Sequence, residues 1–374
     1  MNCLPNSIRV LIPLDDIKRA ENPYVVSLVE NIENMGNNVT FLEGTDVFWK
    51  RDDYDIVHFM WPTAVLDSSH TCRDLEKRLA ELKMMGIKIV STCHNLVPHY
   101  DSVAEHIRCY EIVYEECDEI YHLGNYSLEL FRRAYSCRNR LLYHPVYTKR
   151  YILHPSRKDA LKKLRLGSGK KYVLCFGQVR DDEERRLIRH CAGRLKKDGF
   201  VFLVPSFLPY RLCFAGNILK LAVKKSLLLL IALKEKLLNP NIRWLLQNKV
   251  QEAELPYYFS VADVAFIHRV KILNSGNLPL NFYFGNVVVG PDIGNVGAIL
   301  KERENFVFSP ADFESAADAI KKGYEAQLKG LGKKNREYAI KNWGEEIIAM
   351  KQRNFYMELY LEILRGRLSK NSDA

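Results

Sequence analysis

Two loops in the second half of the chain combine residue types that suit phosphate binding. Gly177 ends a predicted strand and Arg180 follows it closely, so the backbone can approach a diphosphate while the guanidinium pairs with its oxygens. The loop 274–278 leaves another predicted strand and opens a short helix, where free backbone N–H groups and the helix dipole form a phosphate cradle. That loop consists of Asn274, Ser275, Gly276, Asn277 and Leu278.

Each of these loops also has a plainer interpretation. The loop 274–278 serves equally well as a simple helix-capping loop. The acidic residues 181–184 beside Arg180 would repel an anion, or they begin the next helix, whose positive end they suit. A second Gly-rich stretch, 290–297, also follows a predicted strand at a helix start, and two such loops on adjacent strands strengthen the phosphate hypothesis.

The first half of the chain offers histidines and one acid. His94 and Asn95 leave a predicted strand into a loop that ends at His99, and a histidine there can donate to a substrate hydroxyl or handle a proton near neutral pH. The alternative is a loop histidine that caps backbone groups. Asp16 follows the first strand and is a candidate acceptor contact, although a solvated acid is the commoner case. His58 lies inside an apolar run, which favours a core histidine.

Short β-branched runs alternate with helical patterns along the whole chain, which predicts parallel sheets covered by helices on both faces. The predicted strands are 9–12, 38–41, 56–59, 88–92, 119–123 and 141–143 in the first half, and 171–176, 200–204, 242–244, 264–267 and 287–289 in the second. The polar, basic stretch 148–171 interrupts the pattern and predicts a linker.

The predicted fold is therefore α/β, with two tandem Rossmann-like, doubly wound domains. We expect residues 1–150 to bind the acceptor, 151–350 to bind the donor, and 351–374 to form a C-terminal helix that crosses back to the first domain. Ligands of such sheets bind at the carboxyl ends of the strands. The sequence thus predicts a site in a cleft between the two domains.

Composition narrows the classes of partner. The 374 residues include 55 Lys and Arg against 45 Asp and Glu, and the net charge is −5 over 1–150 but +15 over 151–374. A basic second half suits nucleic acid, an anionic membrane or a phosphorylated small molecule. The nine cysteines are scattered and form no C-x-x-C pair, which predicts mostly buried, reduced thiols. The chain shows no secretory signal and no apolar run near 20 residues, so we expect a cytoplasmic protein.

The order of several short motifs resembles glycosyltransferases of the GT-B fold, most closely the family 4 type of bacterial polysaccharide synthesis. The resemblance covers about residues 20 to 360, and its specificity comes from order and spacing. The motifs are His94-Asn95-x-x-Pro98-His99, Phe176-Gly177-x-x-Arg180, Leu255-Pro-Tyr-Tyr-x-x-x-Ala-Asp263, Asn274-Ser275-Gly276-Asn277-Leu and Gly285-Asn-Val-Val-Val-Gly-Pro-Asp-x-Gly294.

The resemblance implies a nucleotide-diphosphate sugar held by the second domain, an acceptor on the first, and transfer without a bound metal or other cofactor. By position, Arg180 would meet the diphosphate, the loop 274–278 would hold phosphate or sugar, and His94 would contact the donor sugar near the reacting carbon. Two departures matter. Ile272 and Leu280 stand where family 4 enzymes usually have two glutamates, and Glu183 stands where a lysine is common. Ribose recognition must therefore differ.

The stretch 211–238 is a long, basic and strongly apolar predicted helix. Such a helix can lie on an anionic membrane surface, or it is buried with its lysines extending outward. Peripheral membrane association is a reasonable hypothesis because bacterial glycan acceptors are often built on lipid carriers.

The sequence thus favours a glycosyltransferase that moves a sugar from a nucleotide-diphosphate sugar to a glycan or lipid-linked acceptor. If configuration is retained, as the resemblance implies, the leaving phosphate itself takes the acceptor proton. If it is inverted, a base is needed, and Asp16, His94 and His99 are candidates. A non-catalytic GT-B subunit and a nucleotide-sugar epimerase of the same fold remain alternatives. Nucleic-acid binding is disfavoured, because no helix combines base-reading polar residues with a clustered basic face.

Overall fold

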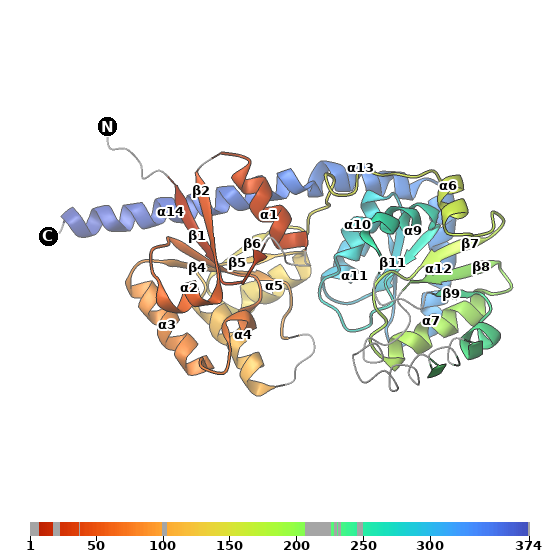
Figure 1. Cartoon of the computed structure of the whole chain (residues 1–374), viewed down its shortest axis with the longest axis horizontal. Helices are drawn as coiled ribbons and strands as arrows, with labels where there is room; N and C mark the ends of the chain where they lie inside the picture. The colour runs from red at the N-terminus through yellow and green to blue at the C-terminus, as the bar shows by residue number, and fades with distance from the viewer. Residues whose placement is uncertain are drawn as a thin grey trace. The chain divides into compact units, whose positions relative to one another are not determined.

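The computed structural model describes residues 7–17, 23–36, 38–98, 103–205, 226–227, 230, 233–244 and 250–372. The chain divides into two compact units (Figure 1): unit 1 comprises 1–147 and 342–374, and unit 2 comprises 148–341. Each unit contains a six-stranded sheet. The predicted α/β class with two doubly wound sheets is confirmed.

Unit 1 is built on a parallel sheet with the strand order β2-β1-β3-β4-β5-β6. The inner strands β3 and β5 are buried along their whole length, as expected for a parallel sheet covered on both faces. The strands are β1 (Ile8–Ile12), β2 (Val39–Glu43), β3 (Ile56–Phe59), β4 (Lys88–Cys93), β5 (Glu119–His122) and β6 (Arg138–Leu141). The helices are α1 (Pro23–Glu33), α2 (Thr45–Lys50), η2 (Pro62–Val65), α3 (Cys72–Met84), α4 (Ala104–Glu116), α5 (Asn125–Ala134) and α14 (Glu345–Ser372).

Unit 2 repeats this plan with the parallel order β12-β11-β10-β7-β8-β9. Its strand order reverses between β7 and β10, and this is the point at which open α/β sheets bind ligands. The strands are β7 (Lys171–Leu174), β8 (Phe200–Val204), β9 (Ile242–Trp244), β10 (Val264–Phe266), β11 (Val287–Pro291) and β12 (Phe306–Phe308). The helices are α6 (Arg157–Lys163), α7 (Asp182–Leu195), η4 (Glu252–Glu254), α9 (Leu255–Val261), α10 (Asn277–Tyr283), α11 (Gly294–Glu302), α12 (Phe313–Leu328) and α13 (Leu331–Trp343), the last of which ends across the unit boundary.

The C-terminal helix α14 belongs to unit 1 and lies against α1 and β1. Tyr356 of this helix is fully buried, and its hydroxyl lies 2.5 Å from Nδ1 of His58 on β3. The other ring nitrogen of His58 lies 2.8 Å from Thr92 Oγ1. Burial lowers the pKa of His58 to about 3, so the ring is neutral at pH 7. His58 is therefore a core histidine, as its apolar surroundings in the sequence predicted.

Element boundaries differ from the prediction mainly at sheet edges. The strand predicted at 141–143 lies instead at Arg138–Leu141, and β12 was not predicted. β6 can carry Arg138 and Arg140 because both pair with carboxylates. Arg138 pairs with Glu119 and Glu362, and Arg140 pairs with Glu119. An edge strand of this kind carries no apolar signal.

The second unit ends at residue 341 rather than at the predicted 350, and the C-terminal helix begins at Glu345 rather than at 351. The predicted linker 148–171 contains the unit boundary but also forms α6. The helices of the C-terminal region are interrupted near Gly330 and Gly344, because α12 ends at Leu328 and α13 at Trp343. Of the stretch 211–238, most residues lie outside those described; 226–227, 230 and 233–238 are helical.

The contact between Tyr356 and His58 predicts a specific stability loss. Tyr356→Phe leaves one nitrogen of a buried imidazole without its partner, so the unfolding free energy should fall by about 1–3 kcal/mol. Urea denaturation at pH 7.5, followed by circular dichroism, measures it. Tyr126→Phe is the matched control, because Tyr126 is 47% exposed in the same unit. Equal stability of the two variants would contradict the role given to Tyr356.

Candidate functional site

The loops predicted to bind phosphate leave the two strands at the switch point of unit 2. Gly177 follows β7, and the segment 267–276 follows β10. Gly177 has a φ of +104°, and a Cβ there would come within 3.1 Å of Asn277 Nδ2. That Asn277 amide donates to the carbonyl of Phe176 at 2.9 Å. The two loops are therefore held together at the edge of the sheet, and a side chain at position 177 would need a left-handed backbone and a shift of the Asn277 amide.

Arg269 is a cation at this point that the sequence analysis missed. It follows β10 by three residues, its side chain is 19% exposed, and its NH2 lies 3.4 Å from the carbonyl of Gln178. The same NH2 would lie 4.0 Å from a Cβ on Gly177. Arg180 leaves the neighbouring loop and is partly buried. A basic residue directly after a buried strand is the signal that could have found Arg269.

Glu184 is the carboxylate that organises these cations. It is 2% exposed, accepts the backbone N–H of Arg180 at 2.8 Å, and lies 3.5 Å from Arg269 Nε. Burial raises its pKa, while the bond from Arg180 and the charge of Arg269 act in the opposite direction. His268, also buried, lies 3.8 Å from the same carboxylate, and burial lowers its pKa to about 4. His268 is therefore neutral at pH 7, and Glu184 fixes the positions of Arg269 and the Arg180 backbone.

The acids beside Arg180 begin a helix, which was the second of the two interpretations. Asp181 caps α7 by accepting the N–H of Glu184 at 2.9 Å. Glu183, at the position where the family 4 resemblance would predict a lysine, lies 3.2 Å from Lys271 Nζ. The loop after β10 thus places the exposed Lys271 beside Glu183 of α7.

In the loop 274–278, two asparagine side chains form hydrogen bonds to other segments of unit 2. Asn274 Oδ1 accepts from Asn295 Nδ2 at 2.7 Å, and Asn277 binds Phe176 as described. Leu278 is buried, Ser275 is partly exposed and Gly276 is exposed. The two asparagine side chains brace the loop, but neither caps α10, whose start has no side-chain cap hydrogen bond.

The two positions without the usual glutamates are part of the core. Ile272 and Leu280 are each 8% exposed. A carboxylate at either place would lose its hydration without a described partner that replaces it, and such burial is costly. These positions therefore serve packing in this chain.

In unit 1, aromatic rings surround His94 where the strands end. The His94 ring stacks on Trp61 with centroids 5.1 Å apart and meets the edge of Tyr24 at 4.7 Å. Tyr24 also lies 5.3 Å from the ring of His144. Tyr114 donates to the carbonyl of Asn95 at 2.7 Å and so fixes the loop after β4. The structure brings together His94 and Asn95 with two aromatic residues, Tyr24 and Trp61, that can line a sugar site.

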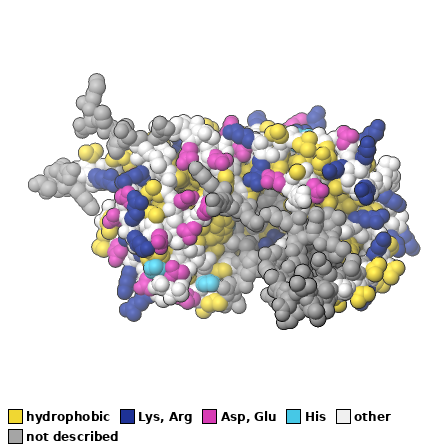
Figure 2. Space-filling view, viewed as in Figure 1, with side chains coloured by type: hydrophobic (Ala, Val, Ile, Leu, Met, Phe, Trp, Pro, Cys, Tyr) yellow, Lys and Arg dark blue, Asp and Glu magenta, His cyan; other side chains and the backbone are white. Residues whose placement is uncertain are grey.

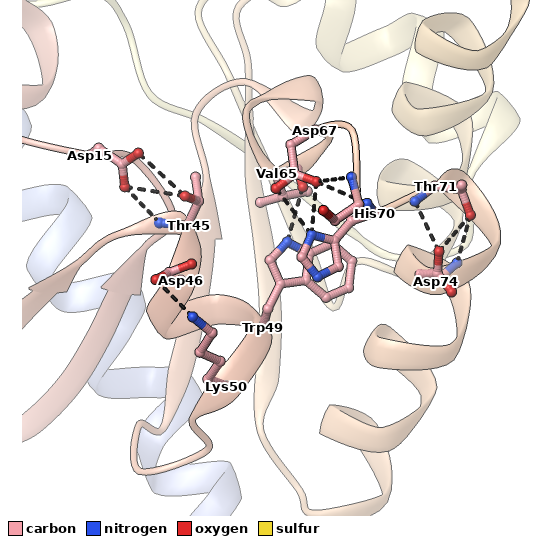
Figure 3. A network of polar contacts seen from close by, with 11 residues as sticks. Asp15, Thr45, Asp46, Trp49, Lys50, Val65, Asp67, His70, Thr71 and Asp74 are labelled. Atoms are coloured by element: carbon pink, nitrogen blue, oxygen red, sulfur yellow. Dashed lines mark hydrogen bonds and ion pairs between the residues drawn. The ribbon is translucent and has the colours of Figure 1, made fainter.

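The remaining first-half candidates are placed differently. Asp16 is exposed with a φ of 53°, while its neighbour Asp15 accepts the N–H of Thr45 at 2.9 Å and so ties the loops after β1 and β2 (Figure 3). Figure 3 also shows His70 stacked on Trp49, with centroids 4.1 Å apart. His99 lies outside the described residues.

No helix in the described part of the chain is long and apolar enough to cross a membrane. No group of three or more His, Cys, Asp or Glu side chains in that part is placed to hold a metal ion. Of the seven cysteines described, Cys72 and Cys137 are partly exposed and the other five are buried, in line with the prediction of mostly buried thiols.

Comparison with solved structures places this fold among glycosyltransferases. Sucrose-phosphate synthase from Thermosynechococcus elongatus matches 95% of this chain and 100% of its own, with a TM-score of 0.70 and 16% identity. A glycosyltransferase from Rickettsia africae matches 95% and 99%, with a TM-score of 0.65 and 13% identity. Anabaena HepE in complex with UDP-glucose matches 94% and 100%, with a TM-score of 0.66 and 12% identity. The chain has the GT-B fold, as predicted.

Sequence comparisons add nothing to this result. No protein-family model matches the chain, and no curated protein is significantly similar to it in sequence. The assignment to family 4 and the predicted cleft between the domains therefore stay predictions.

The close approach at Gly177 predicts the effect of adding one methyl group. Gly177→Ala must adopt a left-handed backbone and displace the Asn277 amide, so the unfolding free energy should fall by about 1–3 kcal/mol or more. Gly330→Ala is the control, because φ is +86° there and no atom lies within 4 Å of the added Cβ. Urea denaturation of both variants measures the difference. If Gly177→Ala costs no more than Gly330→Ala, the contact with Asn277 does not constrain the loop.

Proposed function

We propose that the protein is a glycosyltransferase that takes its sugar from a nucleotide-diphosphate donor. The observation that carries this proposal is the position of Arg180 and Arg269 with Gly177 at the switch point of a GT-B unit. Two guanidinium groups beside a glycine that lets the backbone approach suit a diphosphate. HepE binds UDP-glucose in its solved complex, which makes UDP-sugars the first donors to test.

The proposed chemistry is stabilisation of the leaving diphosphate. Negative charge develops on the diphosphate as the glycosidic bond breaks, and fixed cations beside it lower the barrier. Arg180 and Arg269 supply that charge, and Glu184 holds Arg269 by its Nε and the Arg180 loop by its backbone. In this proposal the reaction needs no metal or other cofactor. Configuration is retained, with the leaving phosphate taking the acceptor proton.

The proposed acceptor is a glycan or a lipid-linked glycan of surface polysaccharide synthesis, bound by unit 1. His94, held by Trp61 and Tyr24, serves the donor sugar near its reacting carbon. Asn95, which follows β4, and the exposed Asp16, which follows β1, are the described candidates for acceptor contacts. Aromatic faces suit sugar rings because they offer apolar surface with polar groups at their edge.

We also propose that the helix within 211–238 rests on an anionic membrane surface. The described leucines of this segment are exposed, and hydrophobic side chains flanked by lysines favour an interfacial helix. They are Leu227, Leu230, Leu233, Leu237 and Leu238, with exposed fractions of 48%, 63%, 58%, 81% and 65%. Such an association would bring the protein to lipid-linked acceptors.

One observation favours a second candidate, a non-catalytic subunit that binds nucleotide or glycan. Ile272 and Leu280 are buried where glutamates are usual, so the donor ribose must be held by other groups. A donor screen separates the two candidates, because only the enzyme releases free nucleoside diphosphate.

The cation pair predicts the outcome of that screen. One nucleotide sugar should raise the melting temperature and be slowly hydrolysed to nucleoside diphosphate. Arg180→Ala and Arg269→Ala should each lower kcat/KM by about 10²–10³-fold, because each removes a charge from the leaving group. Arg186→Ala is the control, since Arg186 is exposed on α7 outside the loops. No shift with any nucleotide, and no effect of either substitution on binding, would favour the non-catalytic subunit.

His94 predicts a different kinetic signature. His94 belongs to unit 1, whereas the diphosphate loops belong to unit 2. His94→Ala should therefore lower kcat by about 10²-fold, while the affinity for nucleoside diphosphate should not change. Steady-state kinetics and calorimetry with the diphosphate measure the two quantities. Weaker diphosphate binding by His94→Ala, with kcat preserved, would contradict the proposed role.

A further inference from the structure

A pocket of about 400 Å³ lies at the end of the unit 2 sheet opposite to the diphosphate loops. It is formed where β7, β8 and β9 begin, by the loop before β7, the turn between α7 and β8, and the residues around the start of β9 (Figure 1). Because the strands of this sheet are parallel, their beginnings and their ends lie at opposite edges. The pocket is thus separate from Gly177 and the segment after β10.

The charged side chains that line the pocket are all cationic. Arg165 and Lys170 come from the loop before β7, Lys196 follows α7, and Arg243 belongs to β9. No Asp or Glu lines the pocket, and within the described part of the chain none of the four cations forms an ion pair. The nearest acid in sequence, Asp198, pairs with Lys321 at 2.8 Å.

The walls that carry these cations are anchored to the fold. The hydroxyl of Tyr172, which lines the pocket, donates to the carbonyl of Gly167 at 2.8 Å and holds the loop before β7. Asn241 donates to the carbonyl of Ala192 at 2.7 Å and holds the opposite wall. Arg165 has a φ of 52°, a backbone conformation that non-glycine residues seldom adopt. The backbone of the walls that carry the cations is therefore held by contacts within unit 2, while the four cationic side chains are exposed.

We propose that this pocket binds a phosphate group, as a monoester or diphosphate. Four cations from three segments line one concave surface with no described carboxylate to neutralise them, and an anion bound among them would offset their mutual repulsion. Arg165 and Arg243 offer planar donor pairs that match phosphate oxygens, and the lysines add point charges. Tyr172 and Phe200 line the pocket as well and supply apolar surface for the group that carries the phosphate.

The phosphate has two possible sources, a free phosphorylated compound or the headgroup of an anionic lipid. The helical residues 233–238 lead directly into the wall formed by Pro240 and Asn241, and Leu237 and Leu238 are 81% and 65% exposed. Figure 2 shows Lys and Arg side chains with hydrophobic side chains below them at the end of unit 2 where β7 and β8 begin. Cations beside exposed leucines suit a membrane headgroup, so both sources are tested.

The test titrates the full-length protein with inorganic phosphate and with pyrophosphate at constant ionic strength, by calorimetry and thermal shift. The pocket variant is Arg165→Gln/Arg243→Gln, and Lys170→Gln/Lys196→Gln is a second one in case the first misfolds. Lys329→Gln/Lys334→Gln removes the same charge from exposed positions in unit 2 away from the pocket. Arg180→Ala separates binding at the diphosphate loops from binding at the pocket.

We expect pyrophosphate binding to persist in Arg180→Ala and to be unchanged in Lys329→Gln/Lys334→Gln. In a pocket variant it should weaken about tenfold or more. Sedimentation with phosphatidylglycerol vesicles, against phosphatidylcholine vesicles, identifies the source: vesicle binding lost in the pocket variants indicates a lipid phosphate. The proposal is wrong if neither free anion nor anionic vesicles bind, or if the pocket variants bind both as the unaltered protein does. This result does not depend on glycosyl transfer, so it stands or falls apart from the proposed function.

Discussion

All six strands of unit 2 run in the same direction, and the placement of every functional group there depends on this constraint. Parallel strands end at one edge, so loops that are about 90 residues apart in sequence meet after β7 and β10. Two hydrogen bonds, from Asn277 to the carbonyl of Phe176 and from Arg269 to the carbonyl of Gln178, then fix their spacing. The same constraint gathers the loops before β7, β8 and β9 at the opposite edge, where the basic pocket lies.

The charge of unit 2 is organised in two ways at these two edges. At the strand ends, Glu184 is buried among Arg269, His268 and the backbone of Arg180, so Arg269 is held in place and partly neutralised. At the strand beginnings, four cations face a pocket without a described acid. Buried pairing gives precise geometry because leaving either partner alone would be costly. Surface cations instead attract an anion through their summed field. Some of the basic residues of the second half therefore hold the loops at the strand ends, and others form a surface that suits anions.

Unit 1 depends on a segment from the far end of the chain. The helix α14 covers the sheet with Tyr356, Leu359 and Ile363, and its Tyr356 hydroxyl meets the neutral ring of His58. Through Thr92 the same histidine contacts β4, the strand that ends just before His94. The C-terminal helix thus supports the strand that positions the unit 1 candidate residue.

The sequence by itself determined the fold class, most of the inner strands, and the loops that hold Gly177, Arg180 and His94. These features are local: a buried parallel strand is an apolar run, and a glycine at its end marks a sharp turn. Tertiary structure decided the rest. Arg269 became a candidate only when β10 was seen to lie beside β7, and Asn274 and Asn277 proved to be braces because their partners, Asn295 and Phe176, are distant in sequence. The edge strand β6 was predicted three residues too late, since its arginines are satisfied by carboxylates of β5 and α14 and give no apolar signal. Periodicity records which side chains are buried, but which charges meet is set by the order of strands in the sheet.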